Sequence, residues 1–240
     1  MKKQVTLVLT EQCNLNCIYC YENHKSSKAM DFITAKKIID DELKNEEEFE
    51  EITIDLFGGE PFLQFDLIQK IDDYIKNLPH KTNIIIFMTT NGTLVHGKIK
   101  EWLKRRHDYV ICGLSYDGTD KVQDMNRSNS SQLIDLDFFH ELYPEQDVKA
   151  TISAESLPYL YESMVYLHRK GFRISCNLAY NIDWSNPSLS AILEQELFKL
   201  INFYLENPHI EPCSLLNQEI DGLALVDLEH PIRRSYCGAG

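Results

Sequence analysis

Three of the seven cysteines lie within eight positions, at Cys13, Cys17 and Cys20, with the spacing C-x3-C-x2-C. They follow a β-prone run, Val5 to Leu9, and precede a helical pattern, which predicts a loop at the end of a first strand. Thiolates this close in sequence can bind one metal centre. Because three thiolates leave a four-iron cluster one protein ligand short, the pattern favours a cluster whose remaining iron binds another molecule.

Two other uses of these cysteines fit less well. A disulfide would leave the third sulfur idle, and it needs an oxidising compartment, whereas no apolar signal segment follows Met1. Structural zinc usually takes four protein ligands, often from two separated C-x2-C pairs. Only Cys17 and Cys20 form such a pair here, and the nearest further zinc ligand is His24. Soft thiolates at this close spacing also suit an iron–sulfur cluster, which the resemblance described next favours over zinc.

The cysteine motif, with the aromatic Tyr19 directly before its last cysteine, resembles the signature of the radical S-adenosylmethionine enzymes. The resemblance implies a [4Fe–4S] cluster held by Cys13, Cys17 and Cys20. The unique iron would take the amino and carboxylate groups of S-adenosyl-L-methionine, and the reduced cluster would cleave it to a 5′-deoxyadenosyl radical. The resemblance also implies an external electron donor such as a flavodoxin or ferredoxin.

Strand-like and helix-like runs alternate along the chain, as expected of βα units in a parallel α/β sheet. At 240 residues and 43% hydrophobic, the chain can bury one sizeable core. Periodicity alone equally allows an open doubly wound sheet, whereas the resemblance implies a partial (β/α)6 TIM-like barrel over residues 1–230. The polar segment 119–135 is expected to be a long loop. The expected strands cover 5–9, 52–57, 84–88, 109–114, 148–152 and 172–178, and the main helices cover about 31–45, 65–78, 97–106, 160–170 and 189–205.

The second expected strand ends in Gly58-Gly59-Glu60-Pro61. Glycine permits unusual backbone angles and a close approach of the backbone to a ligand. The run resembles the family's GGEP motif, which implies that backbone groups of this turn, together with the Glu60 carboxylate, receive the methionyl ammonium group of the cofactor. A plain strand-to-helix turn is the alternative, with Pro61 in the first helical turn.

Further polar residues follow the later strands. Ligand sites of parallel α/β proteins gather at the carboxyl ends of strands, so these residues are expected to share one mouth with the cysteines. The resemblance assigns them to the ribose and methionyl carboxylate of the cofactor, although short polar residues before glycine also suit ordinary turns. Arg127 aligns with an arginine that binds the cofactor carboxylate in related peptide-modifying members, while Gln123 and Asp124 replace the family's usual histidine. The strand-end residues are Thr90, Asn91, Ser115 and Asp117.

By the same resemblance, Tyr19 is expected to pack beside the adenine, and Asn177 with Ala179-Tyr180 to contact adenine or ribose. Cys112 and Cys176 lie inside apolar runs and are expected to be buried as small hydrophobic side chains.

The composition argues against some partners. A net charge of −13 disfavours nucleic acid, because phosphate contacts need a basic face. No run approaches the ~18 apolar residues of a membrane span. Together with the missing signal segment, seven cysteines favour a reducing, cytoplasmic location.

Residues 231–240 end in Tyr236-Cys237-Gly238-Ala239-Gly240, which resembles the opening of a SPASM or twitch extension, the module that carries auxiliary clusters in many of these enzymes. Cys213 is the only other candidate thiolate nearby. The sequence is therefore expected to be a fragment or a truncated form.

The favoured function is that of a radical S-adenosylmethionine enzyme acting on a peptide or protein substrate, similar to anaerobic sulfatase maturases. Two alternatives stay open: the same chemistry on a small molecule such as a nucleotide precursor, and a non-catalytic barrel that binds a peptide or partner.

Overall fold

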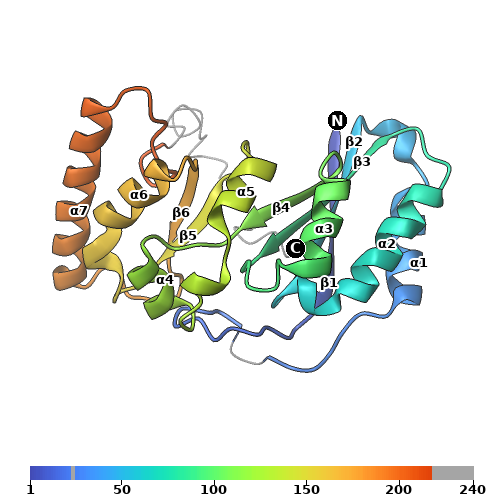
Figure 1. Cartoon of the computed structure of the whole chain (residues 1–240), viewed down its shortest axis with the longest axis horizontal. Coiled ribbons are helices and arrows are strands. Elements are labelled where there is room, and N and C mark those ends of the chain that lie inside the picture. Colours follow the sequence, from blue (N-terminus) through green and yellow to red (C-terminus); the bar gives the residue numbers. More distant parts are fainter. Residues whose placement is uncertain (23–24, 218–240) are drawn as a thin grey trace, which may run out of the picture.

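The computed structural model describes residues 1–22 and 25–217. Six parallel strands alternate with helices, which confirms the predicted α/β fold of parallel strands (Figure 1). The first four strands form one sheet in the order β1-β2-β3-β4, and the last two pair as β5-β6. The strands are β1 (Lys2–Thr10), β2 (Glu51–Gly58), β3 (Asn83–Thr90), β4 (Val110–Leu114), β5 (Val148–Ile152) and β6 (Ile174–Leu178).

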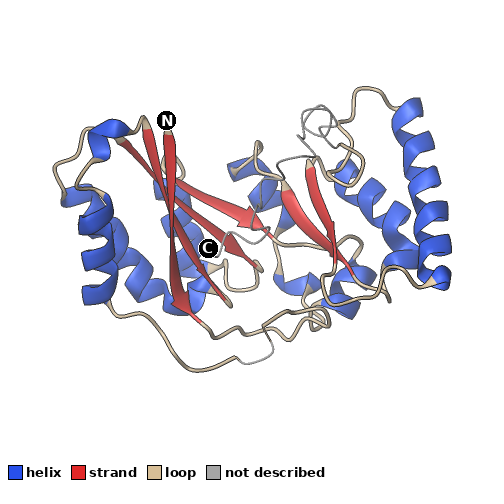
Figure 2. Ribbon diagram, turned by 180° about the vertical axis from the view of Figure 1, so that it is seen from behind, coloured by secondary structure: helices blue, strands red, loops and turns tan. Residues whose placement is uncertain are grey.

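Helices cover the outside of the strands (Figure 2). The α-helices are α1 (Phe32–Glu42), α2 (Phe65–Asn77), α3 (Gly97–Arg106), α4 (Asp120–Asn126), α5 (Leu136–Leu142), α6 (Leu160–Arg169) and α7 (Pro187–Glu206), and short 3-10 turns cover Glu46–Glu48, Pro61–Gln64, Ser131–Leu133 and Leu157–Tyr159.

The two sheets meet at a narrow junction between β4 and β5. Ser115 forms an isolated parallel bridge with Lys149, and the Tyr116 N–H donates to the Lys149 carbonyl at 2.9 Å. In the described part of the chain, the one strand that pairs with β1 is β2, and the one that pairs with β6 is β5; an isolated bridge also joins Thr10 to Ala29. The strands therefore form an open, partial barrel rather than a closed one.

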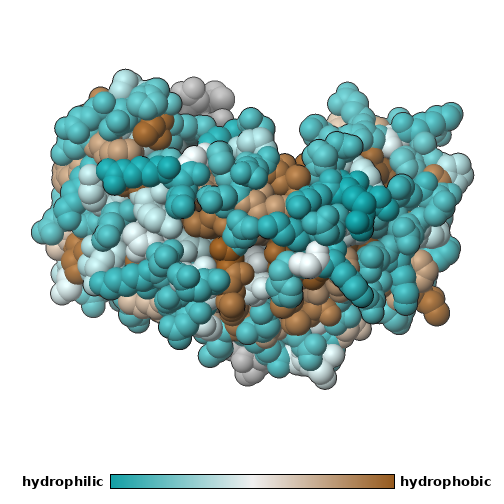
Figure 3. All heavy atoms as spheres, in the orientation of Figure 1, coloured by the Kyte–Doolittle hydropathy of each residue, from teal (hydrophilic) through white to brown (hydrophobic). Residues whose placement is uncertain are grey.

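Side chains alternate along each strand between a buried outer face and a more accessible inner face. On the outer face, Leu7, Ile54 and Ile86 are almost completely buried and belong to one core with Ile39 of α1 and Ile68 of α2. The predicted core cysteines Cys112 and Cys176 are each 1% exposed. On the molecular surface, hydrophilic residues cover most of the helices, while apolar residues gather near the middle of the face in Figure 3.

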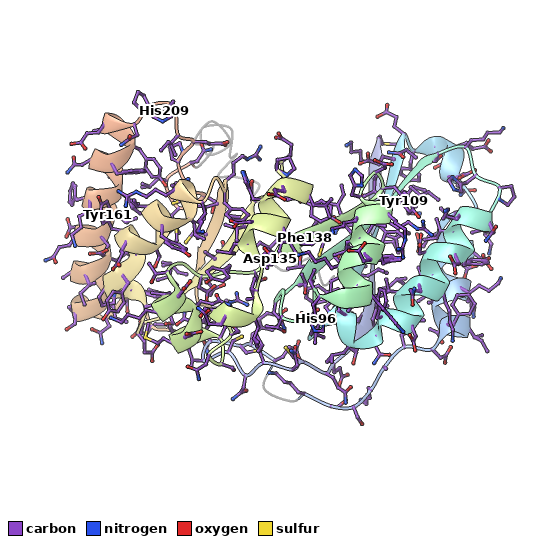
Figure 4. All side chains as sticks on the ribbon, in the orientation of Figure 1. His96, Tyr109, Asp135, Phe138, Tyr161 and His209 are labelled. Carbon is purple, nitrogen blue, oxygen red and sulfur yellow. The ribbon has the colours of Figure 1, made fainter. Side chains whose placement is uncertain are left out.

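Helices α3 and α5 bring the two sheets together on the outside. Lys100 of α3 forms an ion pair with Asp135 at 2.6 Å, and its ammonium lies 4.7 Å from the centre of the Phe138 ring. Figure 4 shows Asp135 and Phe138 in the middle of the molecule, where the chain enters α5. Asp135 also caps α5, because its carboxylate accepts from the Phe138 N–H.

The segment 119–135 is more ordered than the long loop expected from its polar composition. It contains α4, which begins at the Thr119 cap, whose side chain accepts from the Val122 N–H. Val122, Gln123 and Asn126 of this helix are fully buried. A short helix with buried amides has a weak hydrophobic pattern, which explains why the sequence did not reveal it.

Some predictions lie outside the described residues. These are the zinc candidate His24, the boundary expected after residue 230, and the extension-like end with Cys237. In the described ranges, no helix is long and apolar enough to span a membrane.

Candidate active site

A cavity of about 340 Å³ lies at the carboxyl ends of the strands. This volume falls within the range typical of small-molecule sites. The loop after β1 reaches across both sheets, because Ile18 N donates to the Asn126 carbonyl at 3.0 Å and Asn16 N to the Ser128 hydroxyl at 2.8 Å. Figure 1 shows this segment running along the lower edge of the molecule from β1 to α4. The predicted residues on the wall are Cys13, Cys17, Tyr19, Cys20, Gly58, Gly59, Thr90, Asn91, Ser115, Arg127 and Asn177.

The three cysteines are half-buried free thiols on this wall. The Cys20 N–H donates to the Cys17 carbonyl at 3.1 Å, so these two residues share a tight turn. Burial raises the pKa of the Cys17 thiol, and the positive charge of Arg127 opposes that rise. The thiols are thus free to bind a metal centre.

Three thiolates leave a structural zinc ion one protein ligand short, because such ions usually take four. In ranges 1–22 and 25–217, no group of three His, Cys, Asp or Glu residues was found that could hold a single metal ion. Closely spaced cysteine thiolates are the ligands of iron–sulfur clusters, so the donor set of Cys13, Cys17 and Cys20 fits a cluster.

Gly58 and Gly59 press against the strand that leads into the cysteine loop. A Cβ on Gly58, which has φ +153°, would lie 2.4 Å from the Thr10 carbonyl oxygen, and one on Gly59 would lie 2.3 Å from that of Gln12. Backbone hydrogen bonds follow the same path, from Gly59 N to Thr10 O at 3.0 Å and from Glu60 N to Gln12 O at 2.8 Å. The glycines are needed for this close approach of two loops.

Glu60 lies behind the cavity wall rather than on it. Its side chain is fully buried and accepts from Phe62 N at 3.1 Å, the Thr90 hydroxyl at 2.9 Å and Asn91 N at 2.8 Å. Burial raises the pKa of Glu60, and the hydrogen bonds from Asn91, Phe62 and Thr90 oppose that rise. The carboxylate ties the end of β2 to the end of β3, which places Thr90 and Asn91 on the wall.

A chain of amides fixes the cysteine loop to the end of β3. The Asn91 side chain donates to the Asn14 oxygen at 2.9 Å and lies 3.9 Å from the Cys13 sulfur. Asn14 in turn donates to the Thr93 hydroxyl at 2.8 Å. Sequence reasoning missed Asn14 and Thr93, because short polar residues beside Asn and Gly are common in any turn.

Asp117 is also behind the wall and is fully buried. One oxygen accepts from the Tyr19 hydroxyl at 2.6 Å and the Asn126 amide at 3.0 Å. The other accepts from Thr151 N at 2.9 Å and pairs with Arg127 at 3.0 Å. Four donors from this chain therefore satisfy the carboxylate, and Asp117 positions Tyr19 and Arg127.

Arg127 is the cationic group on the wall. It is 8% exposed, and its guanidinium lies 5.4 Å from the centre of the Tyr19 ring. Burial lowers the pKa of Arg127, but the charge of Asp117 outweighs this and holds the pKa above its usual value. Its buried Nε has no hydrogen-bond partner. A buried charged donor without a partner at a cavity fits an anionic ligand group, as expected of a cofactor carboxylate.

Gln123 and Asp124, which stand where a histidine was expected, hold the loop around Arg127. Gln123 accepts from Asp117 N at 3.0 Å and donates to the Ser130 hydroxyl at 2.9 Å, and Asp124 accepts from Ser131 N at 2.8 Å. Neither residue is on the cavity wall.

The far end of the cavity is open and mixed in polarity. Asn177 is exposed and lies on the wall with Ala179 and Tyr180, the latter 95% exposed. Residues not predicted as site residues also contribute: Lys25, Phe57, Thr89 and Thr151. Phe57, Thr89 and Thr151 follow from the inner-face positions of their strands and could be found only once the register was known, whereas Lys25 lies in the loop between β1 and α1.

Comparison with known proteins gives several relatives. The chain is 37% identical over 171 residues to the uncharacterized protein MJ0907 of Methanocaldococcus jannaschii, covering 69% of this chain and 58% of that protein. It is 28% identical over 148 residues to the radical SAM cyclopropyl synthase TigE of Paramaledivibacter caminithermalis (55% and 30% covered). It is 37% identical over 125 residues to the GTP 3′,8-cyclase of Clostridium perfringens (50% and 36%). The chain thus spans less than two thirds of each of these relatives.

Solved structures share the fold. The chain superposes on anSMEcpe with bound AdoMet and Kp18Cys peptide with a TM-score of 0.72 and 18% identity, covering 98% of this chain and 68% of that one. For Streptococcus suis SuiB bound to its precursor peptide SuiA, the TM-score is 0.57 and the identity 16%, with 85% and 46% covered. Residues 7–135, more than half of the chain, match the radical SAM superfamily. The protein belongs to this superfamily, whose members use a [4Fe–4S] cluster and S-adenosyl-L-methionine.

Proposed function

We propose that this protein modifies a peptide or protein by hydrogen abstraction, with its cofactors bound in the cavity at the strand ends. The observation that carries the proposal is one wall with three free thiols and a buried arginine whose Nε lacks a partner. When bound, the reduced cluster and S-adenosyl-L-methionine supply a 5′-deoxyadenosyl radical. The protein supplies binding, orientation and exclusion of water.

Cys13, Cys17 and Cys20 would hold three irons of the cluster. The Asn91 amide, 3.9 Å from the Cys13 sulfur, would stabilise negative charge there and tune the cluster. Because Asn91 is itself fixed by Asn14, the cysteine loop stays attached to the end of β3.

Arg127 would bind the methionyl carboxylate through its free Nε, since its other contact is already made to Asp117. Gly58, Gly59, Thr90, Asn91 and Ser115 would offer backbone and hydroxyl groups to the methionyl ammonium and ribose. Tyr19, held by Asp117, would pack beside the adenine, with Asn177 towards the open end. Glu60 and Asp117 act as positioning residues, because the chain itself satisfies their oxygens.

A peptide substrate is supported by the structures of similar fold that hold peptides, anSMEcpe and SuiB. An external one-electron donor such as a flavodoxin or ferredoxin would reduce the cluster. The six described cysteines are free thiols, which suits work in a reducing cytoplasm.

Anaerobic reconstitution tests the cofactor site. The wild-type chain should bind about four irons and form 5′-deoxyadenosine from S-adenosyl-L-methionine in the presence of dithionite. Cys17→Ala should lose most of the cluster absorbance and all detectable product, whereas the buried Cys176→Ala should keep both. Soluble wild-type protein that binds no iron would refute the proposal.

A small-molecule substrate is the second candidate, favoured by the 37% identity to a GTP 3′,8-cyclase over 125 residues. The two candidate functions differ in which molecule is modified, a peptide or GTP, and mass spectrometry distinguishes them. Reconstituted protein incubated separately with GTP and with peptides encoded near its gene should change a peptide mass if the first proposal is right, and convert GTP if the second is.

A further inference from the structure

The inner face of the open barrel is polar beneath the cofactor cavity. Ile54 and Leu56 of β2 and Val148 and Ala150 of β5 belong to the buried outer core. By strand alternation, Asp55 lies on the opposite, inner face, and the same holds for Lys149, which is exposed. A sheet face with charged residues in mid-strand is not explained by packing.

Asp55 is a buried carboxylate with one oxygen unused. The residue is 9% exposed, and its Oδ1 has no hydrogen-bond partner. Its Oδ2 accepts from the Gln4 amide at 3.1 Å and, more weakly, from the Thr6 hydroxyl at 3.5 Å, both on β1. Since an unsatisfied buried acceptor costs about 1–3 kcal/mol, a missing donor at Oδ1 calls for an explanation.

Lys149 reaches across the junction between the sheets. Its ammonium donates to the Thr89 hydroxyl of β3 at 2.8 Å and lies 5.2 Å from the centre of the Phe87 ring. The lysine stem passes beside Gly113, where a Cβ would lie at an ordinary contact distance of 3.8 Å from the lysine Cε. Burial lowers the pKa of Lys149, and the charge of Asp55 opposes that change.

On each strand, the next residue of the inner face after Asp55 or Lys149 lines the cavity. Phe57 follows Asp55 by two residues and Thr151 follows Lys149 by two, and both line the cavity, as does Thr89. Asp55 and Lys149 interact electrostatically, because the positive charge of Lys149 lowers the pKa of Asp55 and so favours its charged form. No ion pair within 4.0 Å joins them, so each keeps capacity for another group.

We infer that Asp55 and Lys149 together bind one uncharged dipolar group of the substrate, a peptide unit or a carboxamide side chain. Its N–H donates to Asp55 Oδ1, and its carbonyl oxygen accepts from the Lys149 ammonium. The inference rests on the proposed function and adds the part of the chain that recognises the peptide. It identifies these two residues as determinants of specificity on the inner face.

The charges favour such a group over an ion. A carboxylate or phosphate would be attracted by Lys149 but repelled by Asp55. An ammonium group would be attracted by Asp55 but repelled by Lys149. A group with a donor and an acceptor uses both residues. Hydrogen bonds to charged partners contribute about 1.5–3 kcal/mol each, which corresponds to about 10- to 100-fold in affinity.

The test uses the reconstituted, cluster-bearing protein with S-adenosyl-L-methionine and a pool of synthetic hexapeptides, acetylated and amidated so that their termini are uncharged. Retained peptides are identified by mass spectrometry. Asp55→Ala and Lys149→Met should each lower the affinity for the retained peptides about 10- to 100-fold, and Asp55→Asn should lower it less. The double variant should lose less than the sum of the two, because one group contacts both residues.

Matched controls come from the surface pair Asp137 and Lys170, which lie 3.8 Å apart and do not line the cavity. Asp137→Ala and Lys170→Met should retain the peptides as the wild type does. Iron content and thermal unfolding show whether each variant is folded, and Asp55→Asn keeps the side-chain shape if Asp55→Ala does not fold.

The outcomes separate the two proposals. Peptides retained equally by wild type, Asp55→Asn and Lys149→Met would overturn the inference and leave the peptide function standing. If the wild type retains no peptide, the proposed function fails and the inference fails with it. If free amino acids bind in place of the capped peptides, with the same two residues required, the site recognises a zwitterion and the inference is wrong.

Discussion

Two buried carboxylates mark two regions of this molecule and differ in how they are satisfied. Asp117, at the end of β4, is fully buried and takes hydrogen bonds from four groups of its own chain. Asp55, in the middle of β2, is almost as buried but has one oxygen without a partner. The chain satisfies the first carboxylate by itself, whereas it leaves one acceptor of the second without a donor.

The same contrast holds for the other charged groups of the barrel. Glu60 is satisfied by backbone and hydroxyl donors and serves to join two strand ends. Arg127, which lines the cavity, uses one part of its guanidinium on Asp117 and has a buried Nε without a hydrogen-bond partner. Residues whose polar atoms are all paired within the chain hold the site together, and those with an atom left over are the candidates to bind a ligand.

The largest effect should come from Asp117→Ala. This change leaves the buried Arg127 charge without its partner and frees Tyr19, Asn126 and Thr151 N from their shared acceptor. Loss of one member of a buried ion pair costs about 3–5 kcal/mol. Urea unfolding at pH 7, followed by circular dichroism, should show this loss in the free energy of unfolding.

Asp137→Ala is the control for that measurement, because the Asp137 side chain is 78% exposed and should change stability by less than about 0.5 kcal/mol. An Asp117→Ala variant that loses no more than the control would show that the four donors do not depend on this carboxylate. The contrast between Asp117, whose oxygens are satisfied within the chain, and Asp55, which has an unpaired oxygen, would then have no effect on stability.

A smaller effect is expected from Gly59→Ala. The new Cβ would lie 2.3 Å from the Gln12 carbonyl oxygen, so the turn must move away from the cysteine loop. Overpacking of this kind costs about 1–3 kcal/mol, and the displaced loop should also lower iron content after reconstitution. Thermal unfolding and iron analysis measure the two consequences.

Gly113→Ala is the matched control. Its Cβ would make an ordinary contact of 3.5 Å with the Phe87 ring, so iron content should stay at the wild-type level. Equal iron content in Gly59→Ala and Gly113→Ala would mean that the close approach of the two loops does not set the position of the cysteines.

The sequence was informative wherever a short-range pattern determines the structure. Hydrophobic runs predicted the six strands found among the described residues, and the C-x3-C-x2-C spacing predicted thiols that lie in one loop. The position of Thr90 and Asn91 on the cavity wall followed from the rule that parallel strands end at one edge.

What the sequence did not reveal depends on contacts between distant segments. It placed Glu60 and Asp117 at strand ends but could not tell whether their hydrogen-bond donors come from the chain or from a ligand. Asn14 and Thr93 meet only because two loops 79 positions apart fold together. Asp55 and Lys149 were not singled out, because their shared face depends on how β4 meets β5.

The smallest effect on stability is expected from Asp55→Asn. Burial raises the pKa of Asp55 above 3.8, while hydrogen bonds from Gln4 and the charge of Lys149 oppose the rise. A carboxyl whose pKa is higher in the folded than in the unfolded state stabilises the fold fully below the unfolded pKa. That contribution is lost as the pH rises through the folded pKa.

At pH 7 the charged Asp55 should therefore destabilise the fold slightly. Asp55→Asn should be as stable as the wild type or more stable by up to about 1 kcal/mol, with the difference shrinking as the pH falls towards 3.8. Asp31 gives the opposite sign, because the Thr34 N–H lowers its pKa and its contribution is lost on acidification. Urea unfolding of both Asn variants from pH 7.5 down to about pH 3, which spans the unfolded carboxyl pKa of about 3.9, measures the two slopes. A large loss of stability in Asp55→Asn at pH 7 would mean that the fold itself needs the charge, and Asp55 would then belong with Asp117.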